Sequence, residues 1–134
     1  MIIGVDLDGV ISKRGLYNPS LRLPWWLFLL LIPLISFVAP NKKTLKELKR
    51  LENNGDKIII ISARPVQVTN LTRNWLEFHQ VPFSELFCVG FGKGTKQRKL
   101  DVIREEGIQL FVDDDEKFLS FLNNNSIMAI KQLG

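Results

Sequence analysis

Carboxylate side chains occur in two short groups of the sequence, each directly after an apolar run. Asp6-Leu7-Asp8-Gly9 follows residues 1–5, and Asp113-Asp114-Asp115 follows residues 109–112. Carboxylates that lie close together repel one another strongly unless a cation lies between them. If the fold places both groups at one edge, they predict a site for a hard cation that prefers oxygen ligands, most simply Mg²⁺.

Candidate hydrogen-bond donors lie in two further segments. Ser62-Ala63-Arg64 comes directly after residues 57–61, and Lys96 and Lys99 lie near the start of a predicted helix. A hydroxyl and an ammonium group are donors of the kind that a phosphate group requires. Beside a divalent cation, they indicate a site for a phosphorylated ligand.

The segments around these groups alternate between short apolar runs and amphipathic stretches. The apolar runs predict buried strands at 1–5, 57–61, 86–89, 109–112 and 127–130. The amphipathic stretches predict helices from 44 to a stop at 54–55, at 66–79, from 95 to a stop at 107, and at 116–122. This alternation predicts an α/β fold in one domain over 1–134. We expect a doubly wound three-layer sandwich with a central parallel sheet of about five strands and helices on both faces.

Local signals mark the ends and faces of these helices. We expect Thr95 and Asp115 to be the N-caps of the two helices that follow them. In the helix at 66–79, apolar side chains share one face: Val68, Leu71, Trp75 and Phe78.

The predicted sheet would bring the polar groups together, because parallel strands end at one edge and ligands bind there in folds of this class. Taken singly, each group is as common in turns and helix caps as in catalytic sites. Their order along the chain and their shared edge therefore support a catalytic interpretation more strongly than any one motif does.

In this order the groups resemble the four motifs of the haloacid dehalogenase superfamily, and the resemblance covers nearly the whole chain outside an apolar insertion. The segments Ile60-Ile-Ser-Ala-Arg-Pro65 and Gly107-Ile-Gln-Leu-Phe-Val-Asp-Asp114 also look like the small 5′-nucleotidase-type members. The resemblance implies a Rossmann-like sheet and a Mg²⁺-dependent phosphatase that hydrolyses a phosphomonoester.

The resemblance also implies a role for each acidic residue. Asp6 would attack phosphorus and become transiently phosphorylated, while Asp8 would protonate the leaving oxygen and later activate water. Mg²⁺ would be held by the Asp6 carboxylate, the Asp8 main-chain carbonyl and Asp113. Asp114 would support the ion through water.

The resemblance assigns the substrate phosphate to the donor groups. Ser62 and Ala63 would bind it after the second strand, and Lys99 would hold the phosphate and the Asp6 carboxylate together. Lys96 lies closer to the start of the same helix and is a rival for this role.

An apolar stretch over residues 24–40 falls within an insertion at about 20–41, where this superfamily carries its cap. A straight helix of this length would rise roughly 25 Å against a hydrocarbon core of about 30 Å. Pro33 near its centre would break or kink such a helix. A single membrane crossing is therefore not the expectation.

Three interpretations of residues 24–40 stay open: a hairpin in the membrane interface, a lid over the site, or a patch buried in a homodimer. Trp25 and Trp26, with Arg22 before them, suit an interfacial anchor, because aromatic rings and basic groups favour the headgroup level. Basic residues also crowd the following stretch, where they predict either a solvated helix face or an acidic partner: Lys42, Lys43, Lys46, Lys49, Arg50 and Lys57.

The cysteine content indicates the cellular compartment, and the predicted site indicates the kind of partner. The lone Cys88 cannot close an intrachain disulfide and is expected to be a buried thiol. A free thiol fits a cytoplasmic protein. Peripheral membrane association through residues 24–40 stays an open alternative. The expected partner is a small phosphorylated substrate, either a nucleotide or a lipid-linked phosphate, and not a nucleic acid.

A different class of function is a catalytically idle binding module that docks to a membrane or protein partner through residues 24–40. The presence of Asp8 beside Asp6 argues against it, because a binder has no need of an acid/base carboxylate.

Overall fold

The computed structural model describes residues 1–12 and 39–133. Five strands form one sheet in the order β3-β2-β1-β4-β5, and every pairing is parallel. The strands are β1 (Ile2–Asp6), β2 (Lys57–Ser62), β3 (Glu85–Cys88), β4 (Leu110–Val112) and β5 (Ala129–Ile130). The helices are α2 (Lys42–Asn53), the 3₁₀ turn η1 (Val66–Val68), α3 (Thr69–Phe78), α4 (Thr95–Glu105) and α5 (Glu116–Asn124).

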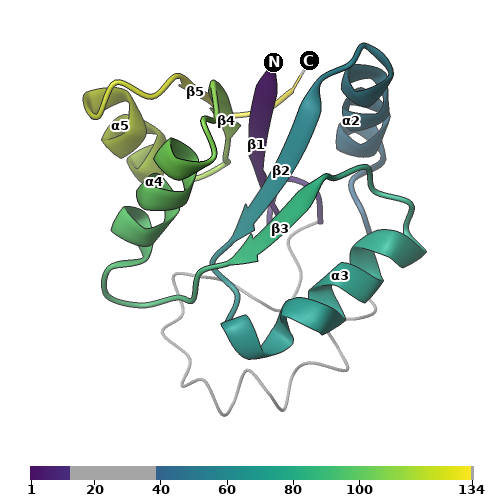
Figure 1. Cartoon of the computed structure of the whole chain (residues 1–134), viewed down its shortest axis with the longest axis horizontal. Coiled ribbons are helices and arrows are strands. Elements are labelled where there is room, and N and C mark those ends of the chain that lie inside the picture. The colour runs from purple at the N-terminus through teal and green to yellow at the C-terminus, as the bar shows by residue number, and fades with distance from the viewer. Residues whose placement is uncertain (13–38, 134) are drawn as a thin grey trace.

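Helices cover both faces of the sheet, so the predicted doubly wound α/β fold is confirmed. Figure 1 shows α2 and α3 on one side of the sheet and α4 and α5 on the other. The centre of β2 is apolar at four successive positions because both of its faces are buried. Ile58 and Ile60 join the core with α2 and α3, whereas Ile59 and Ile61 join the core with α4 and α5. A strand buried on both faces has no polar face to alternate with.

The strand order places a topological switch point beside β1. The chain runs outward from β1 through β2 to β3, and then crosses to the other side of β1 to form β4 and β5. Asp6 pairs with Ile61 of β2, and Val5 pairs with Val112 of β4. Asp6, Ser62 and Asp113 therefore lie at the same edge of the sheet, at or just beyond the strand ends.

Two helix starts test the predicted caps. Asp115 caps α5 as predicted, because its carboxylate accepts hydrogen bonds from the N–H groups of Lys117 and Phe118. The prediction for Thr95 is wrong: Gly94, at φ 88°, is the N-cap, and Thr95 is the first residue of α4. The hydroxyl of Thr95 instead donates back to carbonyl oxygens of the preceding glycine-rich loop.

The helix at 66–79 differs from its prediction in two ways. It begins as a 3₁₀ turn and becomes α-helical at Thr69. Its buried face is centred on Thr72 and Leu76, so Phe78, which the apolar pattern placed on the same face as Trp75, is 81% exposed. If the helix turns about its axis by less than the angle between two successive residues, a side chain of the last turn already moves from the core into solvent.

The edges of the sheet also shift slightly from the prediction. β3 begins and ends one residue earlier than expected, and β5 comprises only two residues, Ala129 and Ile130. Short edge strands are common because they limit unwanted pairing with other chains.

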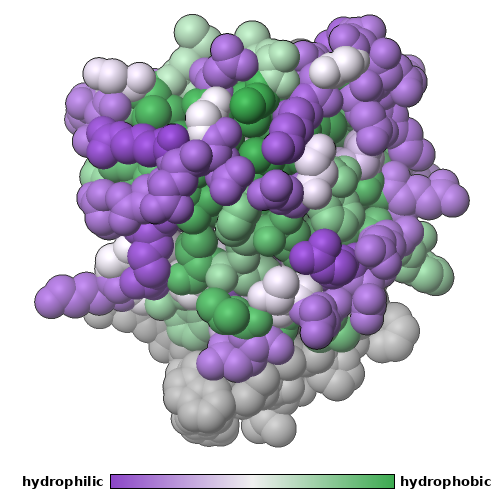
Figure 2. All heavy atoms as spheres, in the orientation of Figure 1, coloured by the Kyte–Doolittle hydropathy of each residue, from purple (hydrophilic) through white to green (hydrophobic). Residues whose placement is uncertain are grey.

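The predicted apolar insertion lies outside the described residues except for its last three positions, 39–41. Within the described ranges, no helix has both the length and the apolar character needed to cross a bilayer. The basic side chains on α2 are exposed. On the face seen in Figure 2, hydrophilic residues cover the outer surfaces of the helices and hydrophobic residues lie between them, over the sheet.

Candidate active site

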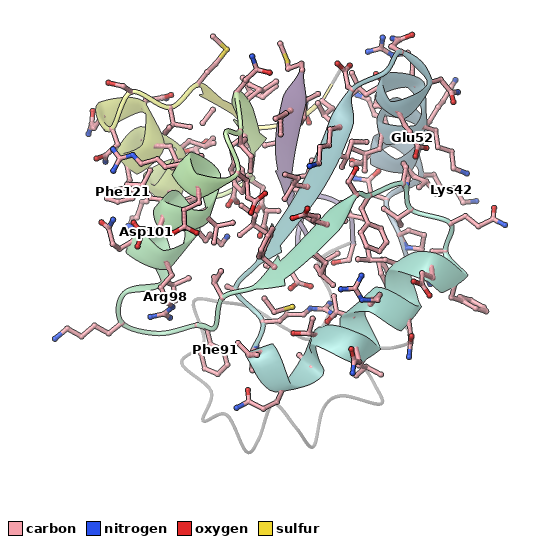
Figure 3. All side chains as sticks on the ribbon, in the orientation of Figure 1. Lys42, Glu52, Phe91, Arg98, Asp101 and Phe121 are labelled. Atoms are coloured by element: carbon pink, nitrogen blue, oxygen red, sulfur yellow. The ribbon has the colours of Figure 1, made fainter. Side chains whose placement is uncertain are left out.

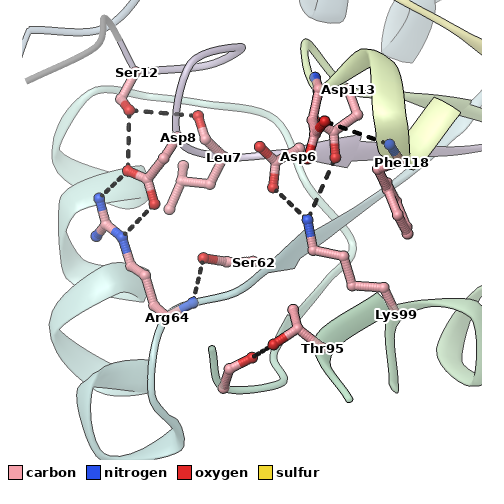
Figure 4. A network of polar contacts seen from close by, with 12 residues as sticks. Asp6, Leu7, Asp8, Ser12, Ser62, Arg64, Thr95, Lys99, Asp113 and Phe118 are labelled. Carbon is pink, nitrogen blue, oxygen red and sulfur yellow. Dashed lines mark hydrogen bonds and ion pairs between the residues drawn. The ribbon is translucent and has the colours of Figure 1, made fainter. Parts of the chain in front are cut away.

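A buried cluster of charged side chains lies at the carboxyl edge of the sheet (Figure 4). The Lys99 ammonium donates to Asp6 Oδ1 at 3.1 Å and to Asp113 Oδ2 at 3.4 Å. All three side chains are at least nine-tenths buried. The sheet and α4 thus bring together residues that lie up to 107 positions apart in the sequence.

Each member of this cluster is fixed by the element that carries it. Asp6 is the last residue of β1, and Asp113 directly follows β4, which pairs with β1. Asp113 also accepts the backbone N–H of Asp115 at 3.0 Å. Lys99 comes from the buried face of α4, and its ammonium lies 5.0 Å from the centre of the Phe118 ring.

The electrostatics of the cluster show an excess of negative charge. Burial raises the pKa of the Asp6 carboxyl well above its usual range, and the neighbouring carboxylates Asp113 and Asp8 raise it further, against the opposing effect of Lys99. Burial also raises the pKa of Asp113. For Lys99, burial alone would lower the pKa, but attraction to Asp6 and Asp113 outweighs burial and raises the pKa above its ordinary value.

The donor set fits a divalent cation. Oxygen atoms of Asp6, Asp113 and Asp114 lie within 4.8 Å of one another. One lysine cannot neutralise this group of carboxylates, and hard cations such as Mg²⁺ prefer carboxylate oxygens. Gly9 permits the arrangement: its φ is +91°, and a Cβ there would lie 2.5 Å from Asp114 Oδ2.

Addition of Mg²⁺ should therefore stabilise the protein. At about 100 times its Kd the ion adds about 2.7 kcal/mol to the free energy of unfolding, a rise in Tm on the order of 10 °C. The rise should shrink as the pH falls into the weakly acidic range, because protons compete with the ion for carboxyls whose pKa is raised.

Thermal unfolding with and without MgCl₂ measures this effect, and two matched variants locate it. Asp113→Asn should abolish the rise in Tm. Asp115→Asn should retain it, because Asp115 is exposed and asparagine is an equally good N-cap. Equal Mg²⁺ responses of the two variants would place the ion elsewhere.

Asp8 has a different cation as its partner. The guanidinium of Arg64 contacts both carboxylate oxygens of Asp8, from Nη2 to Oδ1 at 2.7 Å and from Nε to Oδ2 at 3.1 Å. The Ser12 hydroxyl donates to Asp8 Oδ1 at 3.2 Å. Asp8 itself is about one-fifth exposed, at 18%.

The predicted phosphate-binding residues stand at the end of β2 and on α4. Ser62 is fully buried, and its Oγ accepts the backbone N–H of Arg64 at 3.1 Å, while Ala63 is half-buried. Of the two rival lysines, Lys99 reaches Asp6, whereas Lys96 is exposed. The roles of these residues toward a phosphate stay predictions.

The loop before α4 is anchored by Arg98. Its guanidinium donates to the carbonyl oxygens of Val89 at 2.7 Å, Lys93 at 3.0 Å and Gly90 at 3.2 Å. Figure 3 places Phe91 on this loop and Arg98 at the start of α4. The loop and the first turns of α4 are thereby fixed relative to each other, which fixes the position of Lys99 one residue further on.

Arg64, which lies in a predicted donor segment but has no predicted role of its own, contacts Thr72 and Asp8, and Ser12 also contacts Asp8. Arg64 Nη1 donates to Thr72 Oγ1 at 3.3 Å, so these side chains and Asp8 form one connected group. The signal in the sequence is an arginine three residues beyond the apolar run 58–61, a place where an unpaired charge would be costly.

No protein-family model matches the sequence, and no curated protein matches it. A chain in a structure of the Pnkp1/Rnl/Hen1 RNA repair complex matches with a TM-score of 0.73 at 19% identity, over 98% of this chain and 42% of that one. This chain thus spans less than half the length of that protein.

Two other solved structures match over more of their own length. D,D-heptose 1,7-bisphosphate phosphatase from B. bronchiseptica, complexed with magnesium and phosphate, matches with a TM-score of 0.64 at 12% identity, over 96% of this chain and 78% of that one. The HAD domain of the effector Lem4 from Legionella pneumophila matches with a TM-score of 0.57 at 16% identity, over 98% and 84%. The sheet order and these matches together show that the chain has a haloacid dehalogenase-like fold.

Proposed function

We propose that this protein is a Mg²⁺-dependent phosphatase that hydrolyses a phosphomonoester through an aspartyl-phosphate on Asp6. The observation that carries the proposal is the buried contact of Lys99 with Asp6 and Asp113 at the carboxyl edge of the sheet. That contact joins a nucleophile, a cation ligand and a phosphate-binding cation in one place.

The first half of the reaction transfers the phosphoryl group to the protein. An oxygen of the Asp6 carboxylate attacks phosphorus, the bond from phosphorus to the leaving oxygen breaks, and the leaving oxygen takes a proton from Asp8. Lys99 holds Asp6 Oδ1 and would donate to the phosphate, so the nucleophile and the group it attacks share one anchor. Ser62 would add a donor from the end of β2.

The second half releases phosphate. Asp8, now a carboxylate, takes a proton from water as the water oxygen attacks phosphorus, and the bond to the Asp6 carboxylate breaks. The phosphorylated residue and the base of this step are therefore only two residues apart, at the end of β1 and in the turn that follows it.

The cation would be held by Asp6, Asp113 and Asp114, together with the main-chain carbonyl of Asp8. When bound, Mg²⁺ supplies positive charge that stabilises the transferring phosphoryl group. Burial raises the pKa of Asp6, and a nucleophile must be ionised, so the positive charges beside it also keep it in the reactive form.

The proposed substrate is a small phosphomonoester, either a nucleotide or a lipid-linked phosphate. The resemblance of residues 60–65 and 107–114 to 5′-nucleotidase-type phosphatases favours the nucleotide. Matched structures include ones named as phosphatases of heptose bisphosphate and of 3-deoxy-D-manno-octulosonate 8-phosphate, so phosphorylated sugars belong in the test as well.

Turnover of p-nitrophenyl phosphate, followed by a panel of nucleotides, sugar phosphates and lipid phosphates, tests the proposal. We expect turnover with MgCl₂ and its loss with EDTA. If the wild type and Asp6→Asn show the same negligible turnover of every compound, the proposal fails and the idle binding module is favoured.

Asp8→Asn should lower kcat by roughly 10²–10⁴-fold, the usual contribution of general acid–base catalysis. Asparagine can neither give nor take the proton, although it keeps the shape of the side chain. Steady-state kinetics with p-nitrophenyl phosphate measures the loss. An unchanged kcat would exclude Asp8 from proton transfer.

A further inference from the structure

Arg64 is a charged residue that the proposed reaction leaves without a role, although it is only 4% exposed. It stands two residues beyond β2, and Gly90 donates its N–H to the Arg64 carbonyl at 3.0 Å, which fixes the backbone. A buried guanidinium is costly unless it is paired and hydrogen-bonded. The contacts of the Arg64 guanidinium therefore indicate which groups it positions.

The Arg64 guanidinium contacts two residues, Asp8 and Thr72. Nε and Nη2 lie 3.1 and 2.7 Å from the two oxygens of Asp8, and Nη1 lies 3.3 Å from Thr72 Oγ1 on α3. A two-point contact between a planar guanidinium and a planar carboxylate fixes the orientation of both groups, which a single ammonium contact does not. Thr72 in turn ties the guanidinium to a packed helix.

Asp8 also accepts a hydrogen bond from a residue that follows it in the chain, Ser12. Ser12, 2% exposed, donates to Asp8 Oδ1 at 3.2 Å. Ser12 is fixed by its backbone, because its N–H donates to the Leu7 carbonyl at 2.9 Å and its carbonyl accepts the N–H of Gly9 at 3.1 Å. Donors from two separate elements thus set the direction of the Asp8 carboxylate.

The two buried cations serve different carboxylates. Lys99 contacts Asp6 and Asp113, whereas the contacts of Arg64 go to Asp8 and Thr72 (Figure 4). The site therefore separates the carboxylates that would carry the phosphoryl group and hold the metal from the one that would move protons. A guanidinium cannot serve as the proton donor itself, because it does not lose its proton in proteins.

We propose that Arg64 is a positioning residue for Asp8, which aims the Asp8 carboxylate at the water that releases phosphate from Asp6. The inference rests on the proposed phosphatase function. The paired geometry matches the carboxylate form of Asp8, which is the form that takes a proton from water. Misplacing a reacting group by about 1 Å can cost roughly 10²-fold in rate.

Arg64→Lys tests this role, because lysine keeps the charge and loses the two-point contact. With 2,4-dinitrophenyl phosphate, whose leaving group needs no proton, kcat/KM reports phosphoryl transfer to Asp6, and kcat reports release of phosphate when that step limits turnover. We expect kcat to fall by roughly 10²-fold while kcat/KM stays within about 3-fold. Arg73→Lys is the matched change on α3, where the guanidinium lies over the Phe83 ring, and it should alter neither value.

A double variant separates positioning from a general structural effect. In an Asp8→Asn background, Arg64→Lys should cause no further loss of kcat, because residues that act as a unit are not additive. If Arg64→Lys does not fold, Thr72→Val replaces it, with a smaller loss of kcat in the same pattern.

The opposite results overturn the inference in distinguishable ways. A KM that rises with kcat unchanged would make Arg64 a substrate-binding residue, and an undiminished loss in the Asp8→Asn background would make its role structural. Wild-type turnover together with an unchanged Arg64→Lys would reject this inference alone. No wild-type turnover with Mg²⁺ would reject it together with the phosphatase function.

Discussion

Asp6→Asn should lower kcat for p-nitrophenyl phosphate by roughly 10⁴-fold or more, the scale on which loss of a catalytic nucleophile acts. Asparagine fills the same space at the end of β1 but does not attack phosphorus. Folding should survive, since burial and neighbouring carboxylates raise the pKa of Asp6 and a neutral side chain relieves that repulsion. Without metal, the free energy of unfolding of Asp6→Asn at neutral pH should equal or exceed that of the wild type.

The control for this variant is Asp101→Asn, the same chemical change at an exposed position of α4. Its kcat should match the wild type. A residual kcat in Asp6→Asn within about tenfold of the wild type would mean that another group attacks phosphorus, or that water attacks it directly.

Lys99→Met should cost about 3–5 kcal/mol in the free energy of unfolding of the metal-free protein, as expected when one partner of a buried ion pair is removed. The change leaves Asp6 and Asp113 buried without the ammonium that contacts both. Turnover should be lost as well. Denaturant unfolding at constant pH measures the change, and Lys96→Met, at an exposed position three residues earlier, should stay within about 0.5 kcal/mol of the wild type.

The cost of Lys99→Met should also depend on pH. A carboxyl whose pKa is higher in the folded state than in the unfolded state does not destabilise the fold in acid, where it is protonated in both states. The destabilisation begins as the pH rises above the unfolded pKa and is complete above the raised folded pKa. Both Asp6 and Asp113 are of this kind. We therefore expect a smaller loss in weak acid than at neutral pH, and an equal loss at both would contradict the charge imbalance inferred for the site.

The sheet was predictable because its central strands are buried on both faces. The run Ile58-Ile59-Ile60-Ile61 has no polar face, and only a strand between two helical layers accommodates it. The placement of Asp6 and Asp113 at neighbouring strand ends follows from that sheet. Helix faces were less certain: Phe78 is exposed because α3 packs around Thr72 and Leu76.

The side-chain contacts within the site could not be predicted from the sequence. Arg64 and Asp8 are 56 positions apart, and their contact depends on how the turn after β2 faces the turn after β1. The choice between Lys96 and Lys99 likewise depends on the rotation of α4 about its axis. Asp115 was predictable as a cap because that contact is local, whereas Thr95 was not, because the glycine-rich loop before it lets Gly94 take the position.

The covalent intermediate on Asp6 is the most direct test of the proposed reaction. In Asp8→Asn with 2,4-dinitrophenyl phosphate and Mg²⁺, phosphoryl transfer needs no acid but hydrolysis lacks its base, so the phosphorylated protein should accumulate. Borohydride reduces an aspartyl phosphate to homoserine, which tandem mass spectrometry locates in the chain. We predict homoserine at the position of Asp6 and its absence without substrate. Modification at another residue, or turnover by the wild type with Asp6 never modified in either protein, would contradict the mechanism.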